Sequence, residues 1–333
     1  MNNSILQDIL KQYEQRRHIH ELELDTRKNN LYKSCPKLEE IDSLISKLSI
    51  ETAKSILSSN KNQIEDLKQK IEELKMKKLS ILNELGKPED YLSISYDCPV
   101  CKDTGYILAN NKTEICKCLK QKIYDIQYNT INSNVLKNEN FNNFNLELYS
   151  DIANKELYNS NISPRANIEK IKNSALKFVD IFEDINTKNL LFSGGTGLGK
   201  TFLSNCIVNE LLQKGKTVLY QTAPVMLDAL VANIFNKAEE NSNLAENLLN
   251  VDLLVIDDLG TETMNSMKFT ELYKIINTRL LNNNKPTKTI ISTNLDLQGL
   301  FNNYDERLVS RFIGYYDIYR FFGDDIRIKK IKN

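Results

Sequence analysis

A glycine-rich segment of eight residues constrains the fold of this chain more than any other feature. It fits the pattern G-x-x-x-x-G-K-[ST] and reads Gly194-Gly195-Thr196-Gly197-Leu198-Gly199-Lys200-Thr201. An apolar run, Leu190–Phe192, comes just before it, and a segment with helical character follows. Glycines let backbone N–H groups converge on phosphates, and the N-terminus of the next helix adds positive potential. The pattern therefore predicts a strand, a phosphate-binding loop (P-loop) and a helix, with the loop residues as ligands of ATP.

Two residues at the end of this loop have distinct predicted tasks. Lys200 is expected to reach the β- and γ-phosphates, and the Thr201 hydroxyl is expected to ligate Mg²⁺. The alternative, a glycine turn with an incidental lysine, does not explain why a strand precedes the loop and a helix follows it.

The composition is that of an ordinary soluble protein. The 333 residues suffice for two or three domains, 41% of them are hydrophobic and 26% are charged, and the formal net charge is zero. A net positive field is therefore excluded as the basis of nucleic-acid binding, whereas a local basic face is not. The amino-terminal residues contain no apolar run of signal-peptide length, and no segment is apolar enough to span a bilayer. We expect a cytoplasmic protein with no membrane contact.

Apolar runs alternate with helical segments in the second half of the chain. In order they are Asn189–Ser193, Thr217–Thr222, Asp252–Asp257, Thr289–Thr293 and Tyr316–Phe321. Continuous apolar runs are typical of strands buried on both faces, and helices between them make parallel pairing the expected arrangement. The predicted fold class is α/β, with a parallel sheet flanked by helices.

Two of these runs end in side chains suited to ATP chemistry. Asp257 and Asp258 emerge at the carboxyl end of a predicted strand, where ligands bind in open α/β sheets. Asp257 is expected to hold Mg²⁺ through water, and Asp258 to orient or polarise the attacking water. Asn294 follows Thr289–Thr293. It either hydrogen-bonds the γ-phosphate or the lytic water, or it is only the turn residue that ends the strand.

Residues 1–90 are predicted to form a helical arm. Apolar residues from Ile64 to Leu74 alternate spacings of three and four, and Lys78 interrupts this seam before it resumes. The segment from Leu38 to Leu48 repeats the theme, and Gly86-Lys87-Pro88 supplies a stop signal. A small antiparallel hairpin with so narrow an apolar stripe leaves two interpretations open. Its charges form a solvated face, or the arm docks a partner.

Residues 129–163 are rich in asparagine and lack periodicity, so we interpret them as a linker. Phe141, Phe144 and Leu146 interrupt this segment and are expected to dock on the domain that follows. The predicted organisation is an arm at 1–90, a cysteine module at 91–128, a linker at 129–163 and an α/β domain at 164–333.

Four of the six cysteines lie close together in the sequence. Cys98 and Cys101 form C-x2-C, and Cys116 and Cys118 form C-x-C after fourteen intervening residues. Four thiolates on two short knuckles predict a closed, tetrahedral and structural Zn²⁺ site, with Asp103–Tyr106 turning into a small hairpin. An iron–sulfur cluster fits less well, since no other feature indicates electron transfer, and redox sensing by the C-x-C pair is a further alternative.

The wording and order of these motifs resemble the AAA+ ATPases, and specifically the bacterial DnaC/DnaI family of replicative helicase loaders. The resemblance covers about residues 140–333, the cysteine cluster fits the DnaI-type branch, and the matching segments are NLLFSGGTGLGKTFLSNCI, VDLLVIDDLGTE, TIISTN and ERLVSRFIG. It implies an AAA+ core preceded by the arm and the zinc module.

The resemblance also implies roles for single residues. Asp257 and Asp258 match the acids of the family, Asn294 matches its sensor-1 asparagine, and Arg311 stands where such proteins carry an arginine finger. Arg327 falls where a sensor-2 arginine would lie, or else belongs to a basic tail with Lys329, Lys330 and Lys332. Two further arginines have alternatives of their own: Arg307 pairs with Asp305 or Glu306, and Arg279 is a second contact across subunits or part of a solvated face.

The function implied by the resemblance is ATP-dependent loading of the replicative ring helicase onto single-stranded DNA during replication initiation. ATP, Mg²⁺ and Zn²⁺ are the implied cofactors, with slow, switch-like ATPase activity, weak binding of single-stranded DNA and self-association through the ATPase domain. An IstB-type transposition-helper ATPase is the first alternative, although the four-cysteine module is not expected there. A nucleotide-switched adaptor with little turnover is the second. A DnaA-type initiator is less favoured, because no helix-turn-helix segment follows residue 330.

Overall fold

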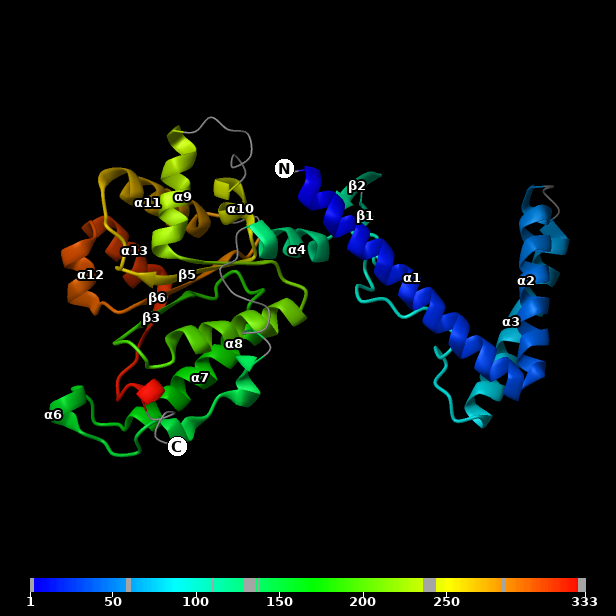
Figure 1. Ribbon diagram of the computed structural model, residues 1–333, viewed down its shortest axis with the longest axis horizontal. Coiled ribbons are helices and arrows are strands. Elements are labelled where there is room, and N and C mark those ends of the chain that lie inside the picture. The colour runs from blue at the N-terminus through cyan, green and yellow to red at the C-terminus, as the bar shows by residue number, and fades with distance from the viewer. Residues whose placement is uncertain are drawn as a thin grey trace. The chain divides into compact units, whose positions relative to one another are not determined.

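The computed structural model describes residues 3–57, 61–109, 111–127, 136, 138–235, 244–282 and 285–328. The chain forms two compact units (Figure 1), one of residues 10–112 and one of residues 113–333 together with residues 1–9. Within the described residues, no helix has the length and apolar character needed to cross a membrane.

The first unit is built on helices, as the period of its apolar residues predicts. They are α1 (Asn3–Ser34), α2 (Pro36–Leu57) and α3 (Lys61–Glu84). The Nζ atom of Lys78, late in α3, lies 2.6 Å from a carboxylate oxygen of Asp42, early in α2, so these two helices run antiparallel. The hairpin expected from the sequence is therefore present, and the lysine that interrupts its seam is a partner in an ion pair. Gly86, with φ of 64°, ends α3 where the stop signal predicts.

The segment after α3 lies along α1. Leu31 and Leu38 cluster with Leu82 and Leu92, which ties the end of the hairpin to the segment that follows it. The hairpin of β1 (Tyr106–Ala109) and β2 (Lys112–Ile115), expected from the turn at Asp103, comes next. It leads into α4 (Lys117–Gln127).

Five described strands of the second unit form one parallel sheet in the order β4-β5-β6-β3-β7. The strands are β3 (Asn189–Ser193), β4 (Val218–Thr222), β5 (Leu253–Leu259), β6 (Lys288–Thr293) and β7 (Tyr316–Arg320). All five predicted strands are confirmed, with ends that match the prediction or differ from it by one or two residues. This is the predicted parallel sheet.

The pleat of the strands divides the core into two layers. On β5, Leu253 and Val255 face one cluster and Leu254 and Ile256 the other, because successive side chains of a strand point to opposite faces. One layer holds α7 (Pro164–Asp180) and α8 (Lys200–Gln213). The other, on the opposite face in Figure 1, holds α9 (Ala223–Phe235), α10 (Leu244–Asn250), α11 (Ser266–Leu280), α12 (Leu297–Asn303) and α13 (Glu306–Tyr315).

The described part of the predicted linker lies on this core. Phe141 and Phe144 are buried in the layer of α7 and α8, together with Tyr149. Three short helices shape this segment: η1 (Phe141–Asn143), η2 (Leu146–Leu148) and α6 (Lys155–Tyr158). Docking of Phe141, Phe144 and Leu146 is thus as expected, with Leu146 partly buried against the same layer. Positions 129–135 and 137 fall outside the described residues.

Candidate nucleotide-binding site

The P-loop joins the carboxyl end of β3 to the first turn of α8, as predicted. Gly194, Gly197 and Gly199 have φ of 144°, 70° and 89°, which residues with a Cβ rarely adopt. Space is limiting as well. A Cβ on Gly194 would lie 2.2 Å from the carbonyl oxygen of Phe321, and one on Gly197 would lie 2.0 Å from Oδ1 of Asp325. Glycine is required here both by the turn and by the chain that covers it.

Lys200 is buried at the start of α8 with its ammonium group turned back over the loop. Its Nζ donates hydrogen bonds to the carbonyl oxygens of Gly194 and Gly195, at 2.6 and 2.7 Å, and to Oδ1 of Asn294, at 2.8 Å. Burial lowers the pKa of Lys200, and the nearby carboxylates oppose this shift. The structure thus brings the loop lysine and the asparagine at the end of β6 together.

Asp257 is buried at the end of β5, and hydroxyl groups surround its carboxylate. The Thr201 hydroxyl donates to Oδ2 at 3.2 Å, and the hydroxyls of Tyr220 and Ser292 donate to the same carboxylate. Burial and the charge of Asp257 raise the pKa of Tyr220, which keeps its hydroxyl a donor. Thr201 and Asp257, the two predicted magnesium residues, are therefore in contact. Sequence reasoning missed Tyr220 and Ser292, because each sits within a strand and reads as core.

Asp258 is more exposed than Asp257 and has a different backbone conformation. Its φ is 56°, and its N–H donates to Oγ of Ser292 at 3.1 Å. Burial and the negative charge of Asp257 raise the pKa of the Asp258 carboxyl group, and Lys200 and Arg327 oppose the shift. A half-buried carboxylate with a raised pKa suits the polarisation of a water molecule.

The positive charge of Arg327 acts on this site. It adds to the lowering of the pKa of Lys200 and opposes the raising of the pKa of Asp258. Lys329, Lys330 and Lys332, the partners in the basic-tail alternative, lie outside the described residues.

The two arginines of α13 have different surroundings. Arg307 is exposed, and its Nε donates to Oδ1 of Asp305 at 2.9 Å, so its predicted pairing within the chain is confirmed with Asp305. The guanidinium carbon of Arg311 lies 5.8 Å from the ring centre of Tyr315, on the same helix. The Tyr315 side chain is itself exposed. Arg311 therefore lies beside a surface residue of α13.

A cavity of about 400 Å³ opens beside the first turn of α8. Its lining is mostly aromatic and apolar, with two amides: Asn143, Phe144, Asn145, Leu148, Tyr149, Phe202 and Ile326. Phe144 lies parallel to Tyr149 and edge-on to Phe202, with ring centres 6.2 and 5.6 Å away. The Tyr149 hydroxyl donates to the carbonyl oxygen of Leu198 in the P-loop, at 3.1 Å. Sequence reasoning missed this cavity, although aromatic residues within an asparagine-rich segment were a usable signal.

The four predicted zinc ligands come together. The sulfur atoms of Cys98, Cys101, Cys116 and Cys118 all lie within 4.8 Å of one another. The first knuckle is held in shape by Asp103, whose two carboxylate oxygens accept the N–H groups of Asp97 and Cys98 at 2.9 and 2.8 Å. Four converging sulfurs are a donor set that Zn²⁺ prefers.

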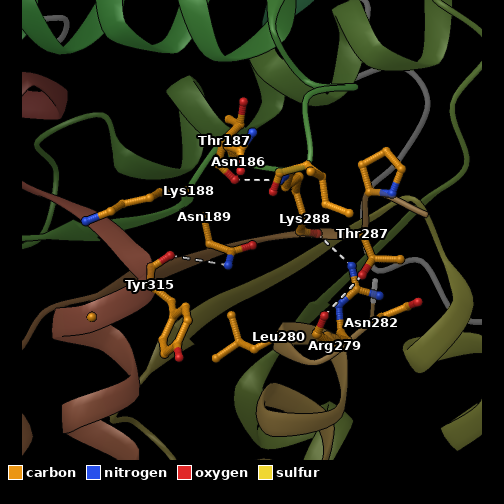
Figure 2. A pocket seen from close by; sticks show the side chains of 13 residues that line it. Asn186, Thr187, Lys188, Asn189, Arg279, Leu280, Asn282, Thr287, Lys288 and Tyr315 are labelled. Atoms are coloured by element: carbon orange, nitrogen blue, oxygen red, sulfur yellow. Dashed lines mark hydrogen bonds between the residues drawn. The ribbon is translucent and has the colours of Figure 1, made fainter. Parts of the chain in front are cut away.

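A second cavity, of about 290 Å³, lies at the opposite end of the sheet, where β3 and β6 begin (Figure 2). Arg279 lines it and is buried, which corrects both sequence interpretations of this residue. Its guanidinium group donates to the carbonyl oxygens of Leu248, Val251 and Lys288, at 2.7, 3.0 and 2.7 Å. Figure 2 shows the bond to Lys288. Arg279 thus joins the end of α10 to the start of β6, and it neither faces solvent nor reaches another subunit.

Part of this chain is similar in sequence to known replication proteins. A model of the bacterial DnaA ATPase domain matches residues 157–315. The replicative helicase loader DnaC of Escherichia coli K12 is 34% identical over 122 residues, which are 37% of this chain and 49% of that protein. DnaC of Buchnera aphidicola subsp. Baizongia pistaciae is 32% identical over 151 residues, 44% of this chain and 58% of the relative. The chain spans about half the length of the relatives it matches.

Two solved structures show a partial likeness to this chain, each with a TM-score below 0.5. "Crystal structure of the DnaC helicase loader" is 22% identical, covers 54% of this chain and 96% of its own, and has a TM-score of 0.43. "Crystal Structure of the DnaI" is 21% identical, covers 60% of this chain and 95% of its own, and has a TM-score of 0.44.

Proposed function

We propose that this chain, whose ATPase core is similar to DnaC helicase loaders and to the DnaA ATPase domain, is a DnaC-type AAA+ protein and an ATP-dependent loader of the replicative helicase. One observation carries the proposal. Lys200, Asn294 and the contacting pair Thr201 and Asp257 meet at the carboxyl end of the sheet, in a core related to that of helicase loaders.

ATP fits this site in three parts. The P-loop and Lys200 would hold the phosphates, with Arg327 adding a second cation. Thr201 and Asp257 would hold Mg²⁺, directly and through water. The aromatic cavity beside α8 would take the adenine, because stacked rings and two amides suit a flat, polar-edged base.

In this proposal, ATP hydrolysis is slow and requires an adjacent copy of the chain. Asp258 polarises the attacking water, Asn294 contacts the terminal phosphate, and Arg311 reaches from an adjacent copy to stabilise charge in the transition state. Self-association through the ATPase domain would then depend on bound ATP. Single-stranded DNA would bind weakly, since a chain with zero net charge has few free cations to displace counterions.

The zinc module and the arm have separate proposed tasks. Zn²⁺ on the four cysteines would be structural, since all its positions are taken by protein ligands. The arm would dock the helicase, because Leu44 and Met76 leave 47% and 66% of their surface exposed on a hairpin with a thin core.

A Lys200→Ala variant tests the nucleotide site. We expect it to weaken ATP binding by at least about tenfold, because it removes a charged hydrogen-bond donor. Calorimetry measures this, with Lys188→Ala as control, since Lys188 is an exposed lysine at the other end of β3. Unchanged affinity in the Lys200 variant would mean that the phosphates bind elsewhere.

Capture of the replicative helicase from the same cells tests the partner. The parent chain is expected to retain it, and Leu44→Asp with Met76→Asp to lose it while keeping ATP affinity. Lys77→Asp is the control, because Lys77 is an exposed residue next to Met76 on α3. If the parent captures transposition proteins instead, the IstB-type alternative is correct. If ATP turnover is absent with and without single-stranded DNA, the adaptor alternative is correct.

Elemental analysis tests the metal. About one zinc per chain is expected, and Cys98→Ser should lose it, whereas Cys35→Ser, outside the cluster, should keep it. A parent chain that folds normally without metal would contradict the zinc site.

A further inference from the structure

Residues 321–327, near the end of the described part of the chain, follow the P-loop closely, and we call them the C-terminal strap. The Phe321 N–H donates to the carbonyl oxygen of Ser193 at 2.7 Å, just before the loop begins. The Ile326 N–H donates to the carbonyl oxygen of Gly197 at 2.9 Å, in the middle of the loop. The Ile326 side chain also lines the aromatic cavity. The strap is thus bonded once to the residue just before the P-loop and once to the loop itself.

Asp325 lies against the loop at Gly197. Its carboxylate occupies the space that a side chain at Gly197 would need, since a Cβ there would lie 2.0 to 2.4 Å from all three carboxylate atoms. The same carboxylate shapes the strap, because its Oδ1 accepts the N–H of Arg327 at 2.9 Å. Asp325 therefore links the P-loop backbone to the residue that carries the cation.

The charge of Asp325 is at odds with its location. A P-loop gathers N–H groups to bind anions, and a carboxylate beside it repels the phosphates. The hydrogen bond that Asp325 accepts from the Arg327 N–H is a structural role that offsets this repulsion. The side chain acts as a local cap that fixes where the following residue leaves the strap.

We propose that Asp325 is a positioning residue that docks on Gly197 and holds Arg327 at the terminal phosphate of ATP. The role rests on the proposed ATP-binding function, and it means that the C-terminal strap contacts the γ-phosphate of ATP. The charged hydrogen bond of Arg327 requires a ligand that carries the γ-phosphate. Asp325 and Arg327 together should therefore raise the affinity for ATP more than the affinity for ADP.

The test measures the ratio of the dissociation constants of ADP and ATP by calorimetry in Mg²⁺, with the full chain. Arg327→Ala is expected to lower this ratio about tenfold, the effect of one lost charged hydrogen bond. Asp325→Ala should lower it to a similar extent, and the double variant should be no worse than either single change. A merely structural role would lower the melting temperature without moving this ratio.

Two further variants separate position from charge. Asp325→Asn keeps the acceptor for the Arg327 N–H and should keep the parent's ratio. Asp324→Ala is the matched control, because Asp324 is the adjacent acid of the strap and contacts Tyr158 instead. It should leave the ratio unchanged.

The proposal is overturned if Asp325→Ala keeps the parent's ratio, if Arg327→Ala does so, or if the effects of the two changes simply add. Asp325→Asn behaving like Asp325→Ala would also overturn it, in favour of a direct effect of charge. Failure of the underlying function looks different. The parent would then bind neither ATP nor ADP, or the Lys200→Ala variant would bind both nucleotides as tightly as the parent does.

Discussion

The ATPase core and the helical arm bury their side chains in different ways. In the core, every residue of β5 except Asp258 is buried, and alternate residues pack into two helical layers. In the arm, the seam residues Ile45, Leu48, Ile71 and Leu74 are only half-buried. The core therefore depends on side chains that meet from distant parts of the sequence, and the arm on a local helical repeat.

This difference predicts unequal local stability. Parallel strands such as β3 and β6 pair residues that are about a hundred positions apart, as Leu190 with Ile290, so the sheet forms as a unit. The arm has fewer fully buried apolar groups, so it is expected to open locally at a lower free energy. Four substitutions test the comparison.

The largest effect is expected at Arg279 of the core. Arg279→Met leaves buried carbonyl groups without their donor and should lower the free energy of unfolding by about 3–5 kcal/mol. Urea unfolding followed by circular dichroism measures this. Arg307→Met, at an exposed arginine, is the control and should not shift the midpoint. Equal effects of the two changes would contradict the structural role of Arg279.

A comparable but local effect is expected at Leu82 of the arm. Leu82 is fully buried, and Leu82→Ala should destabilise the hairpin by about 2–4 kcal/mol through the cavity it leaves. Hydrogen exchange of α2 and α3 should accelerate, whereas ATP affinity should not change. Leu85→Ala is the control, since Leu85 is 42% exposed. If exchange in the sheet accelerates as much as in the arm, the two regions are not independent.

A smaller effect, which depends on pH, is expected at Asp252 of the core. Burial by itself would raise its pKa, but hydrogen bonds from Lys285 and Thr217 lower it from 3.8 to about 2. The folded state therefore favours the ionised form, by about 2 kcal/mol above pH 4. This contribution is lost as the pH falls from about 4 to about 2.

Asp252→Asn should remove this part of the acid dependence. Urea unfolding at pH 7, 4 and 2.5 measures it, and the variant should lose less stability between these values than the parent. Asp317→Asn, at an exposed residue of β7, is the control. A parent whose stability is the same at all three values would contradict the low pKa of Asp252.

The smallest effect is expected at Lys78 of the arm. Its ion pair with Asp42 is partly exposed, so Lys78→Met should destabilise the hairpin by about 0.5–1 kcal/mol, and less at high salt. Hydrogen exchange of α2 measures this, with Lys77→Met as control. An effect as large as that of Leu82→Ala would mean that charge, rather than the leucine seam, holds the arm together.

The sequence by itself determined the features that local pattern encodes. The five strands, the hairpin that ends at Gly86 and the P-loop all follow from periodicity, turn residues and motif spacing within short windows. Lys200, Thr201, Asp257 and Asn294 could be selected for the same reason, because strand ends in a parallel sheet share one edge.

Only the tertiary structure decided which distant side chains meet. Tyr220 and Ser292 reach Asp257 because β4 and β6 flank β5, an order that no short window contains. Arg279 is buried because α11 turns it toward the carbonyl groups at the start of β6, so an arginine that reads as surface became a core residue. Asp325 docks on Gly197 across more than a hundred residues of sequence. Local periodicity specifies the elements, but the contacts between them depend on the order of the strands in the sheet.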